Sequence, residues 1–349
     1  MEYSPGLRGV IAGETKISTV GMEGTSLRYR GYDAIKLTET HTYEDVASLI
    51  ISDDLNGSDF TTFFKQYYTE LDGDNDVNNL FKQIKSRLHP MDVIRTIVSY
   101  IGESEKKSDL ELTTQISAAV AYVIASYNEN DTNELNDKFT VASSMLSNNA
   151  SDDQLQALDD ILILYAEHGF NASTFATRVT GSTRSDLTSS IVSGIGTLKG
   201  ELHGGANERA VELINSFKDV DDATLGVMKM LDEKKKIMGF GHGVYKIQDP
   251  RSPVVKSWVE KLASDDDAKL RFEIAKKIDE IMDKEKKLFP NVDFYGGLLL
   301  SELDFDVNLF TPIFVAGRSV GWAAHYFEQR AEDTLIRPAA KYIGVEERD

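Results

Sequence analysis

The strongest structural signal in this chain is a helix start followed by a long apolar period. Ser151 stands three residues before Gln154, which is the spacing of a capping box. Apolar residues then recur at the helical period up to Tyr165, namely Leu155, Leu158, Ile161 and Leu162. The 349 residues include only 7 prolines, so long helices are little interrupted. These features predict a mainly α-helical fold.

Three further helices are predicted from apolar runs and from acidic residues that can cap them. They cover residues 187–198, the stretch from Asp221 and Asp222 to Lys236, and the stretch from residues 265–267 to Leu288. Segments 15–20 and 26–30 alternate instead, with glycines between them, and predict a small N-terminal β element. Polar clusters over 128–137 and 147–153 predict surface loops.

Composition excludes several classes of function. The chain has no cysteine, which rules out disulfides, thiolate metal sites and a cysteine nucleophile. A net charge of -19 disfavours nucleic acid and anionic lipid as partners. The first residues lack an apolar signal core, and the most apolar stretch, 116–127, is too short to span a membrane. We therefore expect a soluble cytoplasmic protein.

Three histidines and one carboxylate, each in a distinctive local sequence, are the candidate functional groups. The predicted helices place His168 near a helix C-terminus with Gly169 as its C-cap, His203 and His242 in glycine-containing loops, and Asp293 just beyond a helix end. Two imidazoles and one carboxylate can take a proton from carbon on one molecule while donating one to oxygen on another. Carbon–carbon condensation through an enol has this requirement.

Three arginines in unusual local sequences strengthen this interpretation. They are Arg251, Arg318 and Arg337. Guanidinium groups bind carboxylates in a bidentate way, so the three together suit a dicarboxylate, although any one of them alone is compatible with a surface ion pair.

Other uses of the same residues are less favoured. His168, His203 and His242 lack the close helical spacing of zinc motifs, so no metal is expected. The pair Gly239 and Gly241 is too short for a dinucleotide fingerprint and suits exposed backbone amides beside a ligand. For the other histidines, we expect His89 to cap a turn, His325 to pack in the interior, and His41 to be exposed.

These segments resemble the citrate synthase family, whose members condense an acyl-CoA with oxaloacetate. The similarity extends from residues 6–10 to residues 342–344 and corresponds to the short prokaryotic form. Several stretches are most similar to the 2-methylcitrate synthase branch, which uses propionyl-CoA. These stretches are residues 12–15, 19–21, 27–32, 164–168, 170–175 and 321–325.

The resemblance implies an acyltransferase that forms citrate or 2-methylcitrate and releases CoA after thioester hydrolysis. Asp293 corresponds to the base that removes the acyl α-proton, His203 to the donor at the thioester oxygen, and His242 to the acid at the oxaloacetate carbonyl. The oxaloacetate-binding set adds His168, Arg251, Arg318 and Arg337. The CoA-binding residues correspond to Lys236, Ile237, Met238, Gly239, Phe240 and Lys246. No cofactor is implied, because the CoA thioester is itself a substrate.

The resemblance further implies a two-domain helical fold and a homodimer. Residues 1–203 and 302–349 would form the large domain, and residues 204–301 the small domain that carries His242 and Asp293. Closure of the small domain over the large one would exclude water from the site.

Three positions depart from the family pattern. Glu201 replaces the usual proline and is expected to favour the protonated form of His203. Gly169 stands where glutamate is frequent, and Gly243 where arginine is frequent. An alternative function follows from these departures, namely a catalytically weak paralogue that binds CoA or a dicarboxylate as a regulatory protein.

Overall fold

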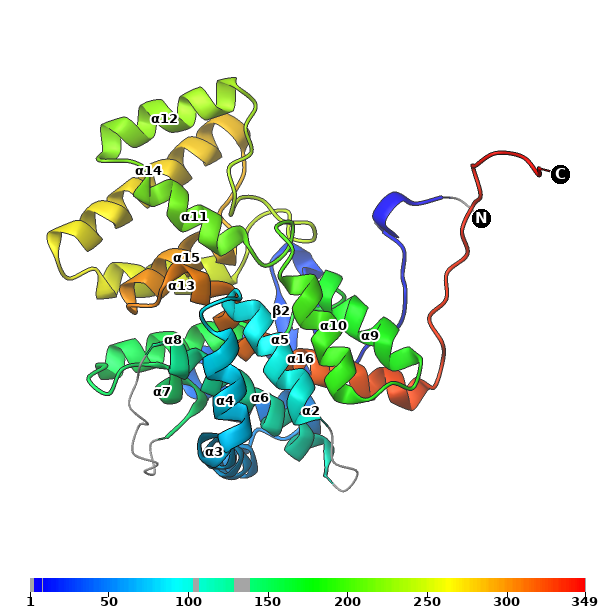
Figure 1. Ribbon diagram of the computed structural model, residues 1–349. Coiled ribbons are helices and arrows are strands. Elements are labelled where there is room, and N and C mark those ends of the chain that lie inside the picture. Colours follow the sequence, from blue (N-terminus) through cyan, green and yellow to red (C-terminus); the bar gives the residue numbers. More distant parts are fainter. Residues whose placement is uncertain (1–2, 8, 103–106, 129–138, 349) are drawn as a thin grey trace.

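The computed structural model describes residues 3–7, 9–102, 107–128 and 139–348. Within them the chain forms a mainly α-helical fold with one small N-terminal sheet, as the sequence predicts (Figure 1). The helices are α1 (Ala34–Thr40), α2 (Tyr43–Ser52), α3 (Ser58–Gly73), α4 (Asn75–Ile84), α5 (Pro90–Ile101), α6 (Asp109–Tyr127), α7 (Val141–Met145), α8 (Asp152–Tyr165), α9 (Ala172–Ser182), α10 (Leu187–Leu198), α11 (Ala206–Asn215), α12 (Val220–Asp232), α13 (Arg251–Leu262), α14 (Asp266–Lys286), α15 (Val292–Glu302) and α16 (Phe310–Glu332). Short 3-10 turns cover Pro5–Leu7, Met22–Gly24 and Val307–Leu309. The expected loop over 128–137 lies outside the described residues, except for Asn128.

The capping box that predicted helix α8 is present. Ser151 Oγ accepts a hydrogen bond from the Gln154 backbone N–H at 3.2 Å, and Gln154 Oε1 accepts one from the Ser151 N–H at 2.9 Å. Two of the first orphan amides of the helix are thereby satisfied. The predicted bounds of α10 are also confirmed, and Asp265 caps α14 as expected.

Helix α12 differs from its prediction at both ends. Its N-cap is Asp219, whose side chain accepts from the Asp222 N–H at 2.8 Å, so Asp222 lies in the first turn. The helix ends at Asp232 instead of Lys236, because Lys234 adopts a left-handed φ of 56° and Lys235 N–H bonds back to the Met230 carbonyl at 2.8 Å.

The N-terminal β element is an antiparallel hairpin of β1 (Ser18–Val20) and β2 (Leu27–Tyr29), to which β3 (Tyr32–Asp33) adds. Ser18 lies opposite Tyr29, and Val20 opposite Leu27. Gly21, at the turn, has a φ of 72°, and a Cβ placed on it would lie 2.6 Å from the Val244 side chain. The hairpin therefore packs directly against the loop that carries His242.

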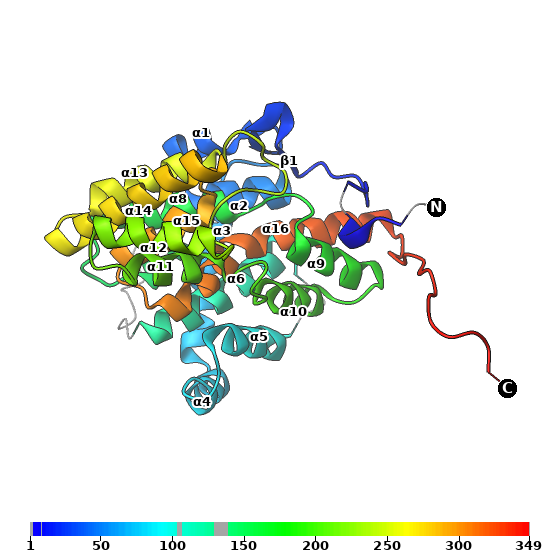
Figure 2. The same cartoon turned by 90° about the horizontal axis from the view of Figure 1, so that it is seen from above.

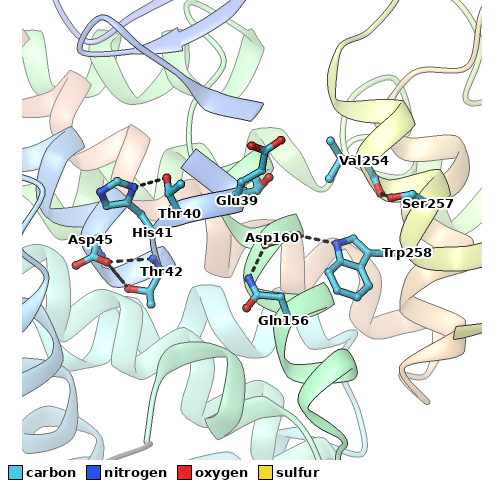
Figure 3. A pocket seen from close by; sticks show the side chains of 11 residues that line it. Glu39, Thr40, His41, Thr42, Asp45, Gln156, Asp160, Val254, Ser257 and Trp258 are labelled. Carbon is cyan, nitrogen blue, oxygen red and sulfur yellow. Dashed lines mark hydrogen bonds between the residues drawn. The ribbon is translucent and has the colours of Figure 1, made fainter. Parts of the chain in front are cut away.

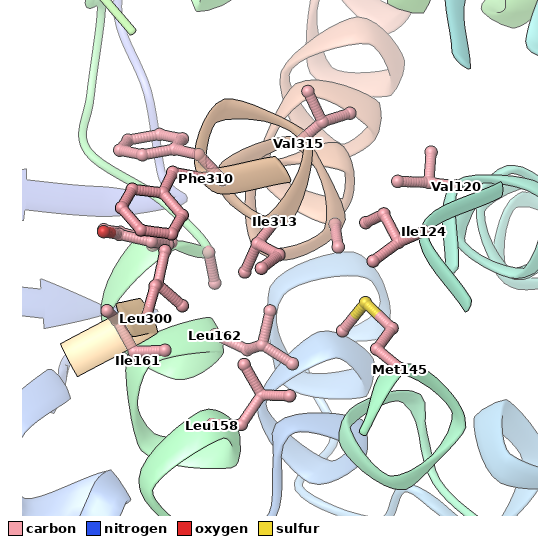
Figure 4. Close-up of a cluster of buried hydrophobic side chains, with 14 of the residues drawn as sticks. Val120, Ile124, Met145, Leu158, Ile161, Leu162, Leu300, Phe310, Ile313 and Val315 are labelled. Atoms are coloured by element: carbon pink, nitrogen blue, oxygen red, sulfur yellow. The ribbon is translucent and has the colours of Figure 1, made fainter. Parts of the chain in front are cut away.

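Helix α16 is the central element of the hydrophobic core. It is buried from Phe310 to Tyr326 and contacts α2, α6, α8, α9 and α10, among which it lies in Figure 2. Figure 4 shows its residues Phe310, Ile313 and Val315 interdigitating with side chains of α6, α7, α8 and α15. A helix that is apolar on all sides has to be enclosed by others, which fixes the helices that bear the site.

Helices α11 to α15 pack mainly on one another, with α12 on α14 and both α11 and α13 on α15 (Figure 1). Helix α13 also faces α8, where Trp258 Nε1 donates to Asp160 Oδ2 at 2.6 Å and Lys261 pairs with Asp153 at 2.7 Å. Beside this seam lies a hollow of about 660 Å³ that contains none of the predicted site residues (Figure 3). The boundaries of the two expected domains stay a prediction.

Candidate active site

His168 lies in the turn between α8 and α9. Helix α8 ends at Tyr165 with Ala166 as its C-cap, so the prediction that Gly169 caps it is wrong. Gly169 instead serves the turn, with a φ of 58° and an N–H that donates to Glu167 Oε1 at 2.5 Å. This turn buries the His168 ring, whose Nε2 lies 3.1 Å from the Tyr245 hydroxyl. Burial and the neighbouring Arg251 hold the pKa of His168 well below its usual range.

His203 occupies the loop between α10 and α11, as predicted. Its Nε2 accepts the Ser173 backbone N–H at 3.3 Å and lies 2.8 Å from Ser173 Oγ. Burial and then the charge of Arg318 lower the pKa of His203 to about 4, so the ring is neutral at pH 7. Because Nε2 accepts a backbone N–H, the proton of the neutral ring is assigned to Nδ1.

His242 is held in the complementary tautomer. Its Nδ1 accepts the backbone N–H groups of Val244 at 3.0 Å and Tyr245 at 3.1 Å, so the proton is assigned to Nε2. Burial and then Arg251 lower the pKa of His242 to about 4. Its ring centroid lies 5.1 Å from that of His168, which brings two of the predicted histidines together.

Asp293 lies in the first turn of α15 and not, as predicted, just beyond a helix end. Asn291 caps this helix by accepting the Asp293 N–H at 3.0 Å. Asn291 Nδ2 also donates to the Gly241 carbonyl at 3.1 Å, which ties the helix start to the loop of His242. Burial of the carboxyl group raises the pKa of Asp293 to about 6, against the lowering effect of Arg251.

Two of the three predicted arginines belong to the same cluster. Arg251 begins α13 and Arg318 lies within α16, and both are almost fully buried. Arg318 Nε donates to the Tyr165 carbonyl at 2.6 Å, and burial lowers its pKa to about 10, so it stays charged at pH 7. The charges of both arginines shift the pKa values of His168 and Asp293. Arg251 acts in addition on His242, and Arg318 on His203.

Arg337 is the one predicted anchor that this single chain does not bring to the cluster. It lies exposed in the tail that leaves the body of the fold after α16 (Figure 1). The neighbouring Ile336 N–H donates to Ser182 Oγ at 3.1 Å, at the C-terminal end of α9. Ser173, which contacts His203, is at the opposite end of that helix, roughly 14 Å away at the helical rise.

The predicted CoA-binding segment, residues 236–240, runs beside residues 289–291. Gly241 N–H donates to the Phe289 carbonyl at 2.8 Å, and Asn291 N–H to the Gly239 carbonyl at 2.9 Å. Lysines 234–236 and 284–287 precede these two paired segments, so two basic stretches enter the same place in an acidic protein. The second stretch was interpreted from the sequence as a solvated helix face. The other predicted phosphate contact, Lys246, is exposed, with Nζ donating to the Gly243 carbonyl at 3.1 Å.

Replacing Gly239 with alanine is expected to disturb this segment. Gly239 has a φ of 83°, and an added Cβ would lie 2.8 Å from Phe294 Cβ and 3.0 Å from its Cα. We expect Gly239→Ala to destabilise the protein by about 1–3 kcal/mol and to raise the KM for acyl-CoA. Gly243→Ala is the matched control, because its Cβ would meet nothing within 4 Å. Equal urea midpoints and equal KM values for the two variants would contradict this assignment.

The expectation that Glu201 favours protonated His203 is wrong. The Glu201 side chain is 86% exposed and turns toward Arg209, with 3.7 Å between their charged atoms. The pKa of His203 is lowered, by burial and by Arg318. A residue two positions away in a turn therefore does not set the protonation of this histidine.

The remaining histidines follow their predictions closely. His89 caps α5, with Nδ1 accepting the Met91 N–H at 3.2 Å. His325 is fully buried and its Nε2 lies 2.9 Å from Glu167 Oε1. His41 is half-buried rather than exposed. In the described part of the chain, no group of three or more potential ligands is arranged to hold a metal ion. No helix among these residues has the length and apolar character to cross a membrane.

Two neutral histidines of opposite tautomer, a carboxyl group of raised pKa and two buried arginines define a site for acid–base chemistry on an anionic substrate. The family model described as "Citrate synthase, C-terminal domain" matches residues 6–339. The chain belongs to the citrate synthase family.

Similar proteins of known name fall in both branches of the family. The chain is 42% identical to 2-methylcitrate synthase of Shewanella oneidensis, over 98% of this chain and 95% of that protein. It is 34% identical to citrate synthase of Haloferax volcanii, over 100% of this chain and 97% of that protein.

Among solved structures, citrate synthase from Thermotoga maritima aligns with a TM-score of 0.85 and 31% identity, covering 99% of this chain and 96% of that one. The ternary complex of Thermoplasma acidophilum citrate synthase with carymethyl coenzyme A in its carboxymethyl form and oxaloacetate aligns with a TM-score of 0.91 and 28% identity, covering 100% and 98%.

Proposed function

We propose that this protein condenses an acyl-CoA, acetyl-CoA or propionyl-CoA, with oxaloacetate and hydrolyses the resulting thioester. The observation that carries the proposal is the pair of opposite tautomers at His203 and His242 beside Asp293. Similarity to a structure solved with a CoA derivative and oxaloacetate supports the two substrate classes. Similarity to 2-methylcitrate synthases supports propionyl-CoA as one acyl donor.

Each member of the cluster takes one step of this reaction. Asp293 removes the α-proton of the acyl group, and the Nδ1–H of His203 donates to the thioester oxygen as the enol forms. The Nε2–H of His242 donates to the oxaloacetate carbonyl during carbon–carbon bond formation.

The oxaloacetate carboxylates are bound by Arg251, Arg318 and His168, whose positive or hydrogen-bonding groups offset the negative charge of the protein locally. An α-proton of a thioester is far less acidic than a carboxylic acid in water. The raised pKa of Asp293 narrows that mismatch, and hydrogen bonding at the oxygen narrows it further. Closure of residues 204–301 over the remainder would exclude water at this stage.

Release of free thiol from each acyl-CoA in the presence of oxaloacetate tests the proposal. The expected result is turnover with at least one of the two, and a folded protein that releases thiol with neither would overturn it. The ratio of kcat/KM for propionyl-CoA to that for acetyl-CoA assigns the branch, because one methylene is worth about 1–3 kcal/mol in a pocket. We also propose a homodimer, which light scattering tests. The expected cytoplasmic location stays a prediction.

The pH dependence of kcat/KM is expected to have an acid limb near pH 6. Only the deprotonated carboxylate of Asp293 can accept a proton, and its pKa is about 6. His203 and His242, with pKa values of about 4, stay neutral through this range. The rate should therefore fall about tenfold per pH unit below pH 6. A profile that stays flat down to pH 5 would contradict the assignment of Asp293 as the base.

A further inference from the structure

Asp249 is a fully buried carboxylate that the proposed reaction does not use. Its Oδ1 accepts the backbone N–H of Arg251 at 3.1 Å and Arg251 Nε at 2.9 Å. Its Oδ2 accepts Arg251 Nη2 at 2.8 Å and the backbone N–H of Val292 at 3.1 Å. One carboxylate therefore joins the start of α13 to the first turn of α15.

We propose that Asp249 is a positioning residue, which fixes the oxaloacetate-binding guanidinium of Arg251 relative to the base Asp293. Val292 directly precedes Asp293, so its N–H bond to Asp249 sets where the α15 backbone begins. This inference rests on the proposed function, because it assigns the two residues that Asp249 connects to two different substrates.

The geometry leaves the carboxylate no alternative arrangement. Each of its oxygens accepts two hydrogen bonds, and the side chain is shielded from water that could replace any of them. The backbone carbonyl of Asp249 also accepts the Ser252 N–H at 3.1 Å, which holds the first turn of α13. Arg251 and Asp293 consequently keep one relative position, and a shift of about 1 Å at such a site can cost about 10²-fold in rate.

The charge of Asp249 also acts on the base. The charged and titratable groups that face Asp293 are Asp249 itself, Arg251 of α13, Arg318 of α16 and Tyr165 of α8. Asp249 raises the pKa of Asp293, and the two arginines lower it. Loss of the Asp249 charge leaves the arginines unopposed, so the pKa of Asp293 has to fall.

Two substitutions separate geometry from charge. Asp249→Asn replaces one accepting oxygen by an NH2 donor, which opposes the N–H groups of Arg251 and Val292. We expect a roughly tenfold rise in the KM for oxaloacetate, a roughly 10²-fold fall in kcat, and an acid limb of kcat/KM moved to lower pH. Asp249→Glu keeps the charge but adds a methylene in a filled site. For this variant we expect the same kind of loss in KM and kcat with the acid limb unmoved.

Glu302→Gln is the matched control for lost stability. Glu302 is another buried carboxylate paired with an arginine, at 3.0 Å from Arg271 Nη2, and it lies at the opposite end of α15. We expect this control to lower the thermal midpoint while KM and the acid limb stay as in the wild type. The proposal is overturned if Asp249→Asn has the wild-type KM and pH profile, or if Glu302→Gln reproduces its kinetic losses.

A binding measurement keeps this test distinct from that of the proposed function. Thiol release by the wild type tests the reaction itself. Oxaloacetate binding to the wild type and to Asp249→Asn, measured by calorimetry, tests the positioning of Arg251 whether or not turnover is seen. A roughly tenfold weaker binding by the variant supports the inference, and equal binding overturns it.

Discussion

Asp293→Asn is expected to lower kcat for thiol release by about 10²–10⁴-fold, which is the usual contribution of a positioned general base. The amide is close to the carboxylate in shape but cannot accept the α-proton. Asn291 caps the helix through the backbone N–H of residue 293, and this bond is retained in the variant. Binding of oxaloacetate should therefore change little, since its anchors are other residues.

The stability of this variant distinguishes a lost base from a damaged fold. Folding raises the pKa of Asp293 to about 6, so the ionised side chain weakens the folded state at all pH values above that pKa and not below its unfolded value. Asp293→Asn should thus be at least as stable as the wild type at pH 7 in thermal unfolding. A variant that keeps kcat within about threefold of the wild type would remove Asp293 from the role of base.

Helix boundaries were predictable where a cap and an amphipathic period coincide. Helix α8 has both and begins where the capping box places it. Helix α15 was missed because it is buried almost all round and contains Gly296 and Gly297, so it has no polar face to give a period. Asp293 was consequently predicted beyond a helix end, although it lies in a first helical turn.

The site was predictable as a set of side chains but not as a set of contacts. The tautomers of His203 and His242 are fixed largely by backbone N–H groups, which every residue except proline possesses and no sequence pattern marks. Asp249 was visible only as a neighbour of Arg251, since its bond to Val292 spans 43 positions. The place of Arg337 depends on the course of the tail after α16.

Trp322→Ala is expected to lower the free energy of unfolding by about 3–5 kcal/mol, the usual range for removing a fully buried tryptophan. Trp322 has no exposed surface and fills the space between α16 and α10, where a Cβ on Gly194 would already lie 3.0 Å from its ring. Its Nε1 donates to Ser173 Oγ at 3.2 Å, and the same hydroxyl lies 2.8 Å from His203 Nε2. The variant should therefore lose activity as well as stability.

The two tryptophans of the chain provide the control for this loss. Trp258 is half-buried and also makes one indole hydrogen bond, to Asp160, so Trp258→Ala should cost only about 1–2 kcal/mol. Trp322→Phe keeps most of the ring volume and loses only the N–H, for which we expect about 1 kcal/mol. Urea midpoints at a fixed protein concentration measure all three. If Trp322→Ala is no less stable than Trp258→Ala, then α9, α10 and α16 close around the cavity, and the rigid support inferred for His203 does not exist.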